Sequence, residues 1–181
     1  MRKLTMQELR RLAPSEFIQK NKIPLSLAAD SIRSGHNVGS LFRLADCFAL
    51  ESILLGGYTA IPPHPEIEKT ALGATKTVSW DKSIDLAKSL GSIKSERDAL
   101  IIGLEQTDLS VSLQSYTPDW SRPIILVLGN EVAGIQNAVL EQLDVCIEIP
   151  QFGTKHSLNV SVAAGVAVWH FVHAWLQGQK A

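Results

Sequence analysis

Three short segments hold the side chains in this sequence that could do chemistry. Residues 33–43 carry an amide and a guanidinium, residues 128–135 place a carboxylate between two glycines, and residues 149–163 carry hydroxyls, a cation and an imidazole. Each segment follows a stretch that is typical of a buried strand. Because open α/β sheets bind their ligands at the carboxyl ends of their strands, we expect the three segments to form one site.

The third segment joins a predicted strand to a predicted helix. Residues 145–149 read as a core strand, Pro150 ends it, and an apolar helical pattern runs from Asn159 to Trp175. The Thr-Lys-His-Ser run at 154–157 combines polar side chains with free backbone N–H groups at a helix N-terminus, which suits an anion such as a phosphate. An ordinary strand-loop-helix connection with a Ser or Asn cap is the alternative.

In the first segment, Asn37 is expected to be the N-cap of a helix. Gly39 would leave room for the Arg43 guanidinium to lean back toward the loop, because helical side chains point toward the helix N-terminus. The alternative is a surface ion pair between Arg43 and Asp46, which would contribute little to stability.

In the second segment, Gly129 and Gly134 bracket Glu131 and permit a ligand to approach the backbone closely. The chain has no G-x-G-x-x-G after a strand, no G-x-x-x-x-G-K-[ST] and no G-x-S-x-G, so dinucleotide binding, P-loop hydrolysis and an α/β-hydrolase nucleophile have no support. His64 and Glu66 are better explained by an exposed Pro-rich loop than by a metal site, and no metal is predicted.

Strands and helices are expected to alternate along the chain. We expect strands at 23–29, 52–55, 77–80, 99–104, 124–128 and 145–149, and helices at 37–49, 66–72, 83–94, 137–142 and 159–175. Strands made of near-continuous Ile, Leu and Val indicate an α/β fold whose mostly parallel sheet is covered by helices on both faces. With 181 residues, no internal repeat and no long linker, one domain over 23–181 is expected.

Residues 1–22 form a basic N-terminal extension. They hold six basic and two acidic side chains, a charge of +4, so the remainder of this −1 chain carries −5. We expect an amphipathic helix that packs Leu4, Leu9, Leu12 and Phe17 on the body, with Arg10 and Arg11 among the charges that contact RNA. Charge appears before any apolar core, so the segment is not expected to be a signal peptide.

The cysteines and the apolar stretches favour a cytoplasmic protein. Cys47 and Cys146 are far apart in the sequence and form no C-x-x-C, so neither a disulfide framework nor a zinc site is indicated. The longest apolar stretch, residues 160–176, contains His170 and His173 and is short for a membrane span, so no membrane partner is predicted.

The predicted C-terminal helix is apolar on two sides. Its main stripe comprises Val160, Ala163, Ala164, Ala167, Val168, Phe171, Val172 and Trp175. Val162, Val166 and Trp169 add a second stripe, which needs a second surface to cover it. A homodimer contact through this helix is therefore predicted.

Together the three segments resemble the SpoU (TrmH-like) branch of the SPOUT RNA methyltransferases. Motif 1 of that family, N-[IV]-G-[AS]-x-x-R-x-A, is similar to residues 37–45, and motif 2, G-x-E-x-x-G-[IL], is similar to residues 129–135. Motif 3, I-P-M/Q-x-G-x-x-x-S-L-N-V-S, resembles residues 149–161 at every fixed position. The resemblance covers roughly residues 24–176 with motif order and spacing kept.

The resemblance implies transfer of a methyl group from S-adenosylmethionine to a ribose 2′-hydroxyl of structured RNA, on a fold with a C-terminal trefoil knot. By position, the cofactor would contact Leu104, Gly129, Gly134, Ile149 and Leu158, with Ile135 nearby. The implied catalytic residues are Asn37, Arg43, Glu131, Ser157 and Asn159, and Lys155 and His156 would supply charge for RNA. Since a guanidinium is nearly always protonated, Arg43 is expected to stabilise the developing alkoxide and clamp a phosphate, with proton abstraction as the alternative.

The acceptor RNA is left open by the motifs. Residues 102–107 and 142–149 also resemble the eukaryotic-type enzymes that methylate the D-loop guanosine of tRNA, and a short basic extension favours tRNA over rRNA. A catalytically silent RNA-binding protein on the same fold and a related enzyme that methylates a base nitrogen are the rival interpretations.

Overall fold

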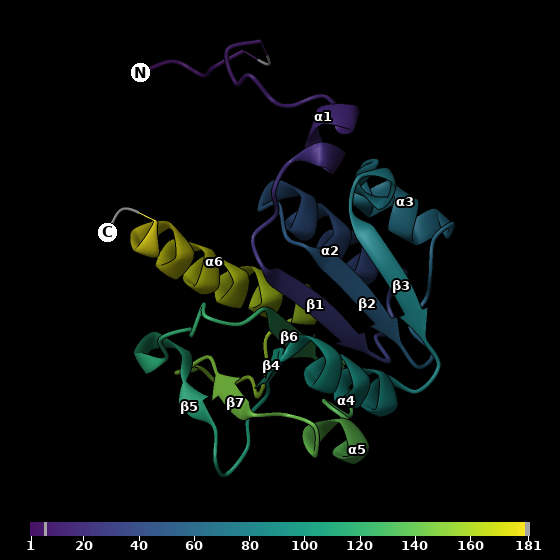
Figure 1. Cartoon of the computed structure of the whole chain (residues 1–181), viewed down its shortest axis with the longest axis vertical. Helices are drawn as coiled ribbons and strands as arrows, with labels where there is room; N and C mark the ends of the chain where they lie inside the picture. Colours follow the sequence, from purple (N-terminus) through teal and green to yellow (C-terminus); the bar gives the residue numbers. More distant parts are fainter. Residues whose placement is uncertain (6, 180–181) are drawn as a thin grey trace.

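The computed structural model describes residues 1–5 and 7–179. Among these residues, seven strands form a single sheet in the order β3-β2-β1-β6-β4-β7-β5, and every neighbouring pair is parallel (Figure 1). The strands are β1 (Leu25–Asp30), β2 (Ser52–Gly56), β3 (Ser79–Ser83), β4 (Leu100–Leu104), β5 (Val111–Ser112), β6 (Ile124–Leu128) and β7 (Val145–Glu148). The predicted α/β fold is confirmed; the short strand β5 was not predicted.

Helices cover both faces of the sheet, as the apolar strands require. The helices are α1 (Pro14–Gln19), α2 (Gly35–Cys47), α3 (Pro65–Ala71), α4 (Leu86–Arg97), α5 (Asn137–Leu140) and α6 (Val160–Gly178), with short 3-10 turns η1 (Ala74–Lys76) and η2 (Leu113–Ser115). The α2, α3 and α6 helices lie on one face, and α4 and α5 lie on the other (Figure 1).

The central strand β1 shows how the two faces share one sheet. Its side chains alternate, so that Leu25, Leu27 and Ala29 pack into the core beneath α2 and α6, whereas Ala28 packs into the core beneath α4. All six residues of β1 are buried. The sheet is therefore a rigid base for the loops that leave its carboxyl edge.

Four neighbouring strands bring the three chemical segments together. The register pairs Ala29 of β1 with Leu128 of β6, Leu128 with Leu104 of β4, and Leu104 with Ile147 of β7, so these strands end at the same level. The loops that follow them must therefore meet at one edge of the sheet. The trefoil knot stays a prediction.

Both edge strands are poor templates for adding another strand. The β5 strand has only two residues, and β3 presents Asp81 and Lys82 to solvent. Short length and charged side chains are the usual means by which proteins blunt a sheet edge.

The N-terminal segment is less helical than predicted. Its helix, α1, begins only at Pro14, because proline has no N–H to continue an earlier helix but fits the first helical turn. Leu4 is 59% exposed and Leu12 is 47% exposed, whereas Phe17 is half-buried, so the expected apolar stripe packs on the body only in part. The end of α1 is held by Lys22, whose Nζ donates to the Phe17 carbonyl oxygen and lies over the Phe17 ring.

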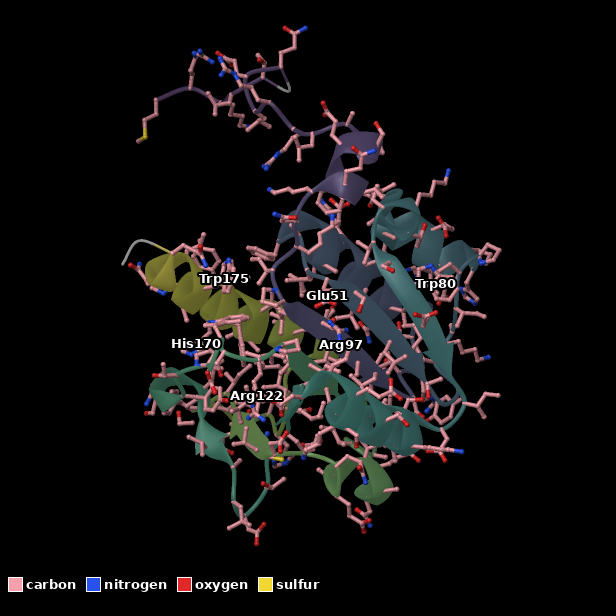
Figure 2. All side chains as sticks on the ribbon, in the orientation of Figure 1. Glu51, Trp80, Arg97, Arg122, His170 and Trp175 are labelled. Atoms are coloured by element: carbon pink, nitrogen blue, oxygen red, sulfur yellow. The ribbon has the colours of Figure 1, made fainter. Side chains whose placement is uncertain are left out.

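The C-terminal helix α6 has the two apolar sides that its sequence predicts. Its main stripe is buried at Ala164, Ala167, Val168, Phe171 and Val172. Trp175 of the same stripe packs edge-on against Trp120, and His170 Nε2 lies 2.7 Å from the Tyr116 carbonyl oxygen. Figure 2 labels His170 and Trp175 on α6.

The second stripe of α6 is open to solvent. Val162, Val166 and Trp169 are 53%, 44% and 52% exposed. By length and composition alone α6 could cross a membrane, a property it shares with core helices of soluble proteins.

Candidate active site

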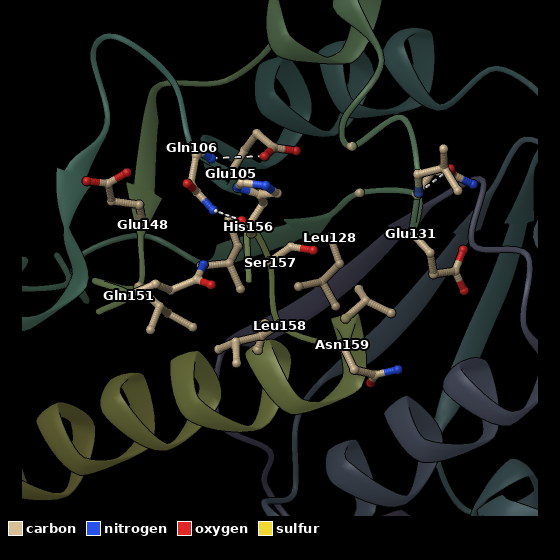
Figure 3. A pocket seen from close by; sticks show the side chains of 18 residues that line it. Glu105, Gln106, Leu128, Glu131, Glu148, Gln151, His156, Ser157, Leu158 and Asn159 are labelled. Atoms are coloured by element: carbon tan, nitrogen blue, oxygen red, sulfur yellow. Dashed lines mark hydrogen bonds between the residues drawn. The ribbon is translucent and has the colours of Figure 1, made fainter. Parts of the chain in front are cut away.

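A cavity of about 510 Å³ opens where β4, β6 and β7 end and α6 begins (Figure 3). We call it the strand-end cavity. All five residues that the motifs predict for cofactor binding line it, namely Leu104, Gly129, Gly134, Ile149 and Leu158. Glu131, Ser157 and Asn159, three of the predicted catalytic residues, line it too, together with His156.

A chain of hydrogen bonds joins the three motifs beside this cavity. The Asn37 side-chain amide donates to Glu131 Oε1 at 2.8 Å, and the Asn159 amide donates to Asn37 Oδ1 at 3.0 Å. One residue from each motif thus takes part, although they are separated by 94 and 122 positions in the sequence. The sheet brings these residues together, as the positions of the motifs after parallel strands predict.

Asn37 makes these contacts because it is not the helix cap. The prediction that it caps α2 is wrong: Ser34 is the N-cap, and its hydroxyl oxygen accepts from the Asn37 backbone N–H at 3.3 Å. Gly35 and His36 therefore belong to the helix. The buried Asn37 side chain is left free to bridge Glu131 and Asn159.

Glu131 is held as an ionised acceptor. Partial burial acts to raise the pKa of its carboxyl group, but hydrogen bonds from the Arg33 backbone N–H, the Asn37 side chain and the Ser34 backbone N–H outweigh it and hold the pKa below its ordinary value. Glu131 therefore fixes the loop in front of α2.

The two glycines of motif 2, Gly129 and Gly134, are needed for the turn that this loop makes. A side chain on Gly129 would put its Cβ 2.4 Å from the Gly134 carbonyl carbon and 2.5 Å from the Ile135 nitrogen, so backbone packs on backbone there. Gly134 has φ +68°, which favours glycine. Asn130 closes the turn, since its backbone N–H and carbonyl both pair with Gly134.

Three positioning residues were missed from the sequence. Glu105 Oε2 accepts from the Ile135 N–H at 3.0 Å, and Gln106 Nε2 donates to the His156 carbonyl oxygen at 3.0 Å (Figure 3). Asn130 donates to the Ser31 carbonyl oxygen at 2.7 Å. Their positions directly after strands β4 and β6 were the available signal, because polar residues at strand ends of an open sheet face the ligand edge.

The segment before α6 does not offer a free helix N-terminus. The Asn159 side-chain oxygen accepts from the Ser161 and Val162 backbone N–H groups at 2.9 Å and 3.3 Å, so the expected anion-binding N–H groups already have a partner. Residues 151–159 are exposed, and Lys155 lies outside the cavity that His156 and Ser157 line. The Asn cap, the simpler alternative, is confirmed.

Arg43 lies away from the strand-end cavity. It is exposed on α2, six residues beyond Asn37, which corresponds to about 9 Å along a helix axis. Gly39 does not make room for it, because a Cβ there would meet Thr70 Oγ1 and the Ile67 carbonyl oxygen of α3. Within the described residues Arg43 forms no ion pair with Asp46, whose carboxylate accepts from the Thr77 hydroxyl.

Arg43 instead lines a second cavity, of about 720 Å³, between the N-terminal segment and the ends of α2 and α3. We call it the N-terminal cavity. Arg10 and Arg11, predicted to bind RNA, line it as well. The predicted site residues thus fall into two cavities, except for Asn37 and Lys155, which line neither.

The strand-end cavity fits the cofactor that the motifs imply. Its volume lies within the roughly 300–1,000 Å³ of small-molecule sites. Leu104, Leu128 and Leu158 provide apolar surface for the faces of a base, while the backbone around Gly129 can pair with its polar edge. Among residues 1–5 and 7–179, no three His, Cys, Asp or Glu side chains group as metal ligands would.

Comparisons with known proteins agree with the motifs. The 23S rRNA (guanosine-2′-O-)-methyltransferase RlmB of Neisseria meningitidis serogroup B is 33% identical over 145 residues, which are 80% of this chain and 56% of that protein. The chain spans about three fifths of the length of the curated relatives it matches.

Solved structures share the fold. The TrmH/SpoU tRNA modifying enzyme of A. aeolicus is 24% identical with a TM-score of 0.80, covering 92% of this chain and 82% of that one. The SpoU methyltransferase AviRb of Streptomyces viridochromogenes, solved with AdoMet, is 21% identical with a TM-score of 0.77, covering 89% of this chain and 61% of that one. The model of the SpoU rRNA Methylase family matches residues 24–169, and the chain belongs to this family.

Proposed function

We propose that the protein is an RNA methyltransferase that uses S-adenosylmethionine to methylate a ribose 2′-hydroxyl. The observation that carries this proposal is the hydrogen-bond chain from Glu131 through Asn37 to Asn159, which assembles one residue of each family motif beside a nucleoside-sized cavity. Membership of a methylase family supports the reaction class. Intact motif residues disfavour a silent RNA-binding protein.

When bound, the cofactor would supply a methyl group on a positively charged sulfur. The bond from methyl to sulfur would break as the ribose oxygen takes the methyl, S-adenosylhomocysteine would leave, and the hydroxyl proton would pass to water. The chain's part is to hold the reactants in line, because correct orientation alone lowers the barrier greatly. Leu104 and Leu158 would hold the adenine faces and the Gly129–Gly134 turn its edge. Ser157 and Asn159, at the mouth of the same cavity, would hold the target nucleotide.

Arg43 would stabilise the oxygen as it loses its proton. A guanidinium is a fixed cation, so it acts by its charge on the developing alkoxide and on the adjacent phosphate. Because Arg43 lines the N-terminal cavity, it can act only if RNA spans the two cavities or if a neighbouring copy supplies it.

We also propose a homodimer through the exposed stripe of α6. Val162, Val166 and Trp169 form an apolar surface next to α2, since Trp169 contacts the Phe48 ring with centroids 5.9 Å apart. Covering this stripe would remove apolar area from water.

We propose a cytoplasmic location, because the proposed substrate is RNA and because two cysteines, Cys47 and Cys146, are free.

The names of the curated relatives favour ribosomal RNA as the substrate. RlmB proteins act by name on a 23S rRNA guanosine. The tRNA D-loop guanosine predicted from the sequence is the second candidate, and the short basic N-terminal segment favours it.

The test is methyl transfer in vitro from labelled S-adenosylmethionine to separate tRNA and rRNA preparations, followed by nucleoside mass spectrometry. We expect a 2′-O-methyl nucleoside, most of it in one RNA class. If the label is found in a base-methylated nucleoside, the proposal is wrong and the enzyme methylates a base nitrogen. Absence of label with both RNA classes, while S-adenosylmethionine still binds, would contradict it.

A further inference from the structure

The N-terminal cavity has a strongly basic lining. Its charged residues are five cations and one anion, and the cations are Arg10, Arg11, Lys20, Arg43 and Lys76. They come from separate parts of the chain: the N-terminal segment, α2 and η1. The anion, Asp46, already accepts a hydrogen bond from Thr77. The fold thus gathers positive charge in one hollow on a chain whose net charge is −1.

These cations are not used to hold the protein together. In the described part of the chain, none of the five forms an ion pair or a side-chain hydrogen bond, whereas Arg97 pairs with Glu51 at 2.6 Å and Lys94 pairs with Asp144 at 2.6 Å. Figure 2 shows Glu51 and Arg97 on the body of the protein. Like charges around one hollow repel one another, so an anion that enters the hollow lowers the free energy of the arrangement.

The cavity also offers apolar surface between the charges. Leu9, Leu12 and Leu72, which are 38%, 47% and 68% exposed, line it with the cations. An RNA strand presents the same alternation, because charged phosphates are separated by sugars with less polar faces. A compact anion would use only the charges, whereas a strand could use both.

We propose that the N-terminal cavity binds the phosphate backbone of the substrate RNA, with the N-terminal segment as one wall and Arg43 as its contact on α2. This inference rests on the proposed function and names where the substrate lies. The strand would run over α2 from this cavity, which Arg43 lines, toward the strand-end cavity, whose lining residues Glu131 and Asn159 are hydrogen-bonded to Asn37 of the same helix. Such contacts carry affinity without reading the sequence.

The test removes charge from the cavity and leaves the proposed catalytic residues intact. The variant combines Arg11→Ser, Lys20→Ser and Lys76→Ser, and a matched control combines Lys69→Ser, Lys82→Ser and Lys88→Ser, three exposed lysines outside the cavity. Binding of bulk tRNA and of fragmented rRNA is measured at several salt concentrations, and S-adenosylmethionine binding is measured by calorimetry.

We expect the cavity variant to bind RNA about tenfold more weakly, with a salt slope smaller by about 2, because each lost phosphate contact removes roughly 0.7 from the slope on a single strand. The control should bind RNA within about twofold of the original chain. Exchanging the three residues as Arg11→Lys, Lys20→Arg and Lys76→Arg should keep most of the affinity, which separates loss of charge from misfolding.

The inference is overturned if the cavity variant binds RNA as well as the control does. If the chain methylates RNA and this result is obtained, the proposed function stands and the cavity belongs to another partner. If the cavity variant loses RNA binding but the original chain methylates no RNA, the cavity is supported and the proposed reaction falls.

Discussion

The two cavities hold their polar groups in opposite ways. Beside the strand-end cavity, Glu131, Asn37 and Asn159 satisfy one another, so the geometry is set before any ligand arrives. In the N-terminal cavity none of the five cations forms an ion pair within the described part of the chain, although Asp46 lines the cavity with them. We propose that the first cavity orients the reaction and that the second attracts the RNA. Orientation and attraction can therefore be disrupted separately.

The largest expected effect is the loss of turnover when Arg43 is replaced, because Arg43 lines the N-terminal cavity and is proposed to act on the reaction as well. Arg43→Ala should lower kcat by about a hundredfold to a thousandfold, because it removes the cation proposed to face the developing alkoxide. S-adenosylmethionine affinity should change less than about twofold, since Arg43 does not line that cavity. Single-turnover methylation and calorimetry measure the two quantities; turnover close to that of the original chain would remove Arg43 from the mechanism.

The next effect is on stability at the strand-end cavity. Asn37→Ala breaks both hydrogen bonds of a buried side chain and should lower the free energy of unfolding by about 1–3 kcal/mol. Asn137→Ala, at the exposed start of α5, is the matched control and should stay within about 0.5 kcal/mol. Urea unfolding compares them, and equal losses would show that the bridge between the motifs contributes nothing.

Salt should distinguish the two cavities directly. Between roughly 50 and 200 mM salt, RNA affinity should fall about tenfold to a hundredfold, because binding phosphates releases counterions. Affinity for S-adenosylmethionine should change less than about twofold, because this small ligand has no phosphate backbone and its binding releases few counterions. Parallel titrations of the same preparation test this contrast, which would fail if both affinities followed salt equally.

The smallest effect is the pH dependence of Glu131. Its pKa in the folded protein lies below the ordinary 4.5, so the ionised side chain stabilises the fold above that pH, and the contribution is lost as the pH falls through the folded-state pKa. The difference in unfolding free energy between the original chain and Glu131→Gln should therefore be constant from pH 7 to about 5 and shrink below about 4.5. A difference that grows on acidification would have the wrong sign for this account.

Much of the fold and the strand-end cavity could be predicted from the sequence. Parallel strands with continuous Ile, Leu and Val must be covered by helices on both faces, and motifs that follow such strands lie at the same edge of the sheet. All five predicted cofactor residues line one cavity for this reason.

The predictions for Asn37 and Gly39 were wrong because their contacts are made with distant parts of the chain. Ser34 and Asn37 are both good helix caps, and only the tertiary contact with Glu131 decides that Asn37 is used elsewhere. Gly39 was assigned to Arg43 because its neighbour α3, which packs against it, lies about 30 residues further along the chain. Glu105 and Gln106 directly follow β4, which marks them as candidates for the ligand edge, but their partners Ile135 and His156 are distant in sequence and no local pattern identifies those partners.

The blunt edges of the sheet have a consequence for how this protein behaves at high concentration. A two-residue β5 and a charged β3 leave little backbone on which another chain could extend the sheet, so fibril-like growth by strand addition is disfavoured. Copies that crowd together in a cell would therefore meet through helix surfaces rather than through strands. Replacing Asp81 and Lys82 with β-branched apolar residues would remove these charges from the edge and make aggregation by strand addition more favourable.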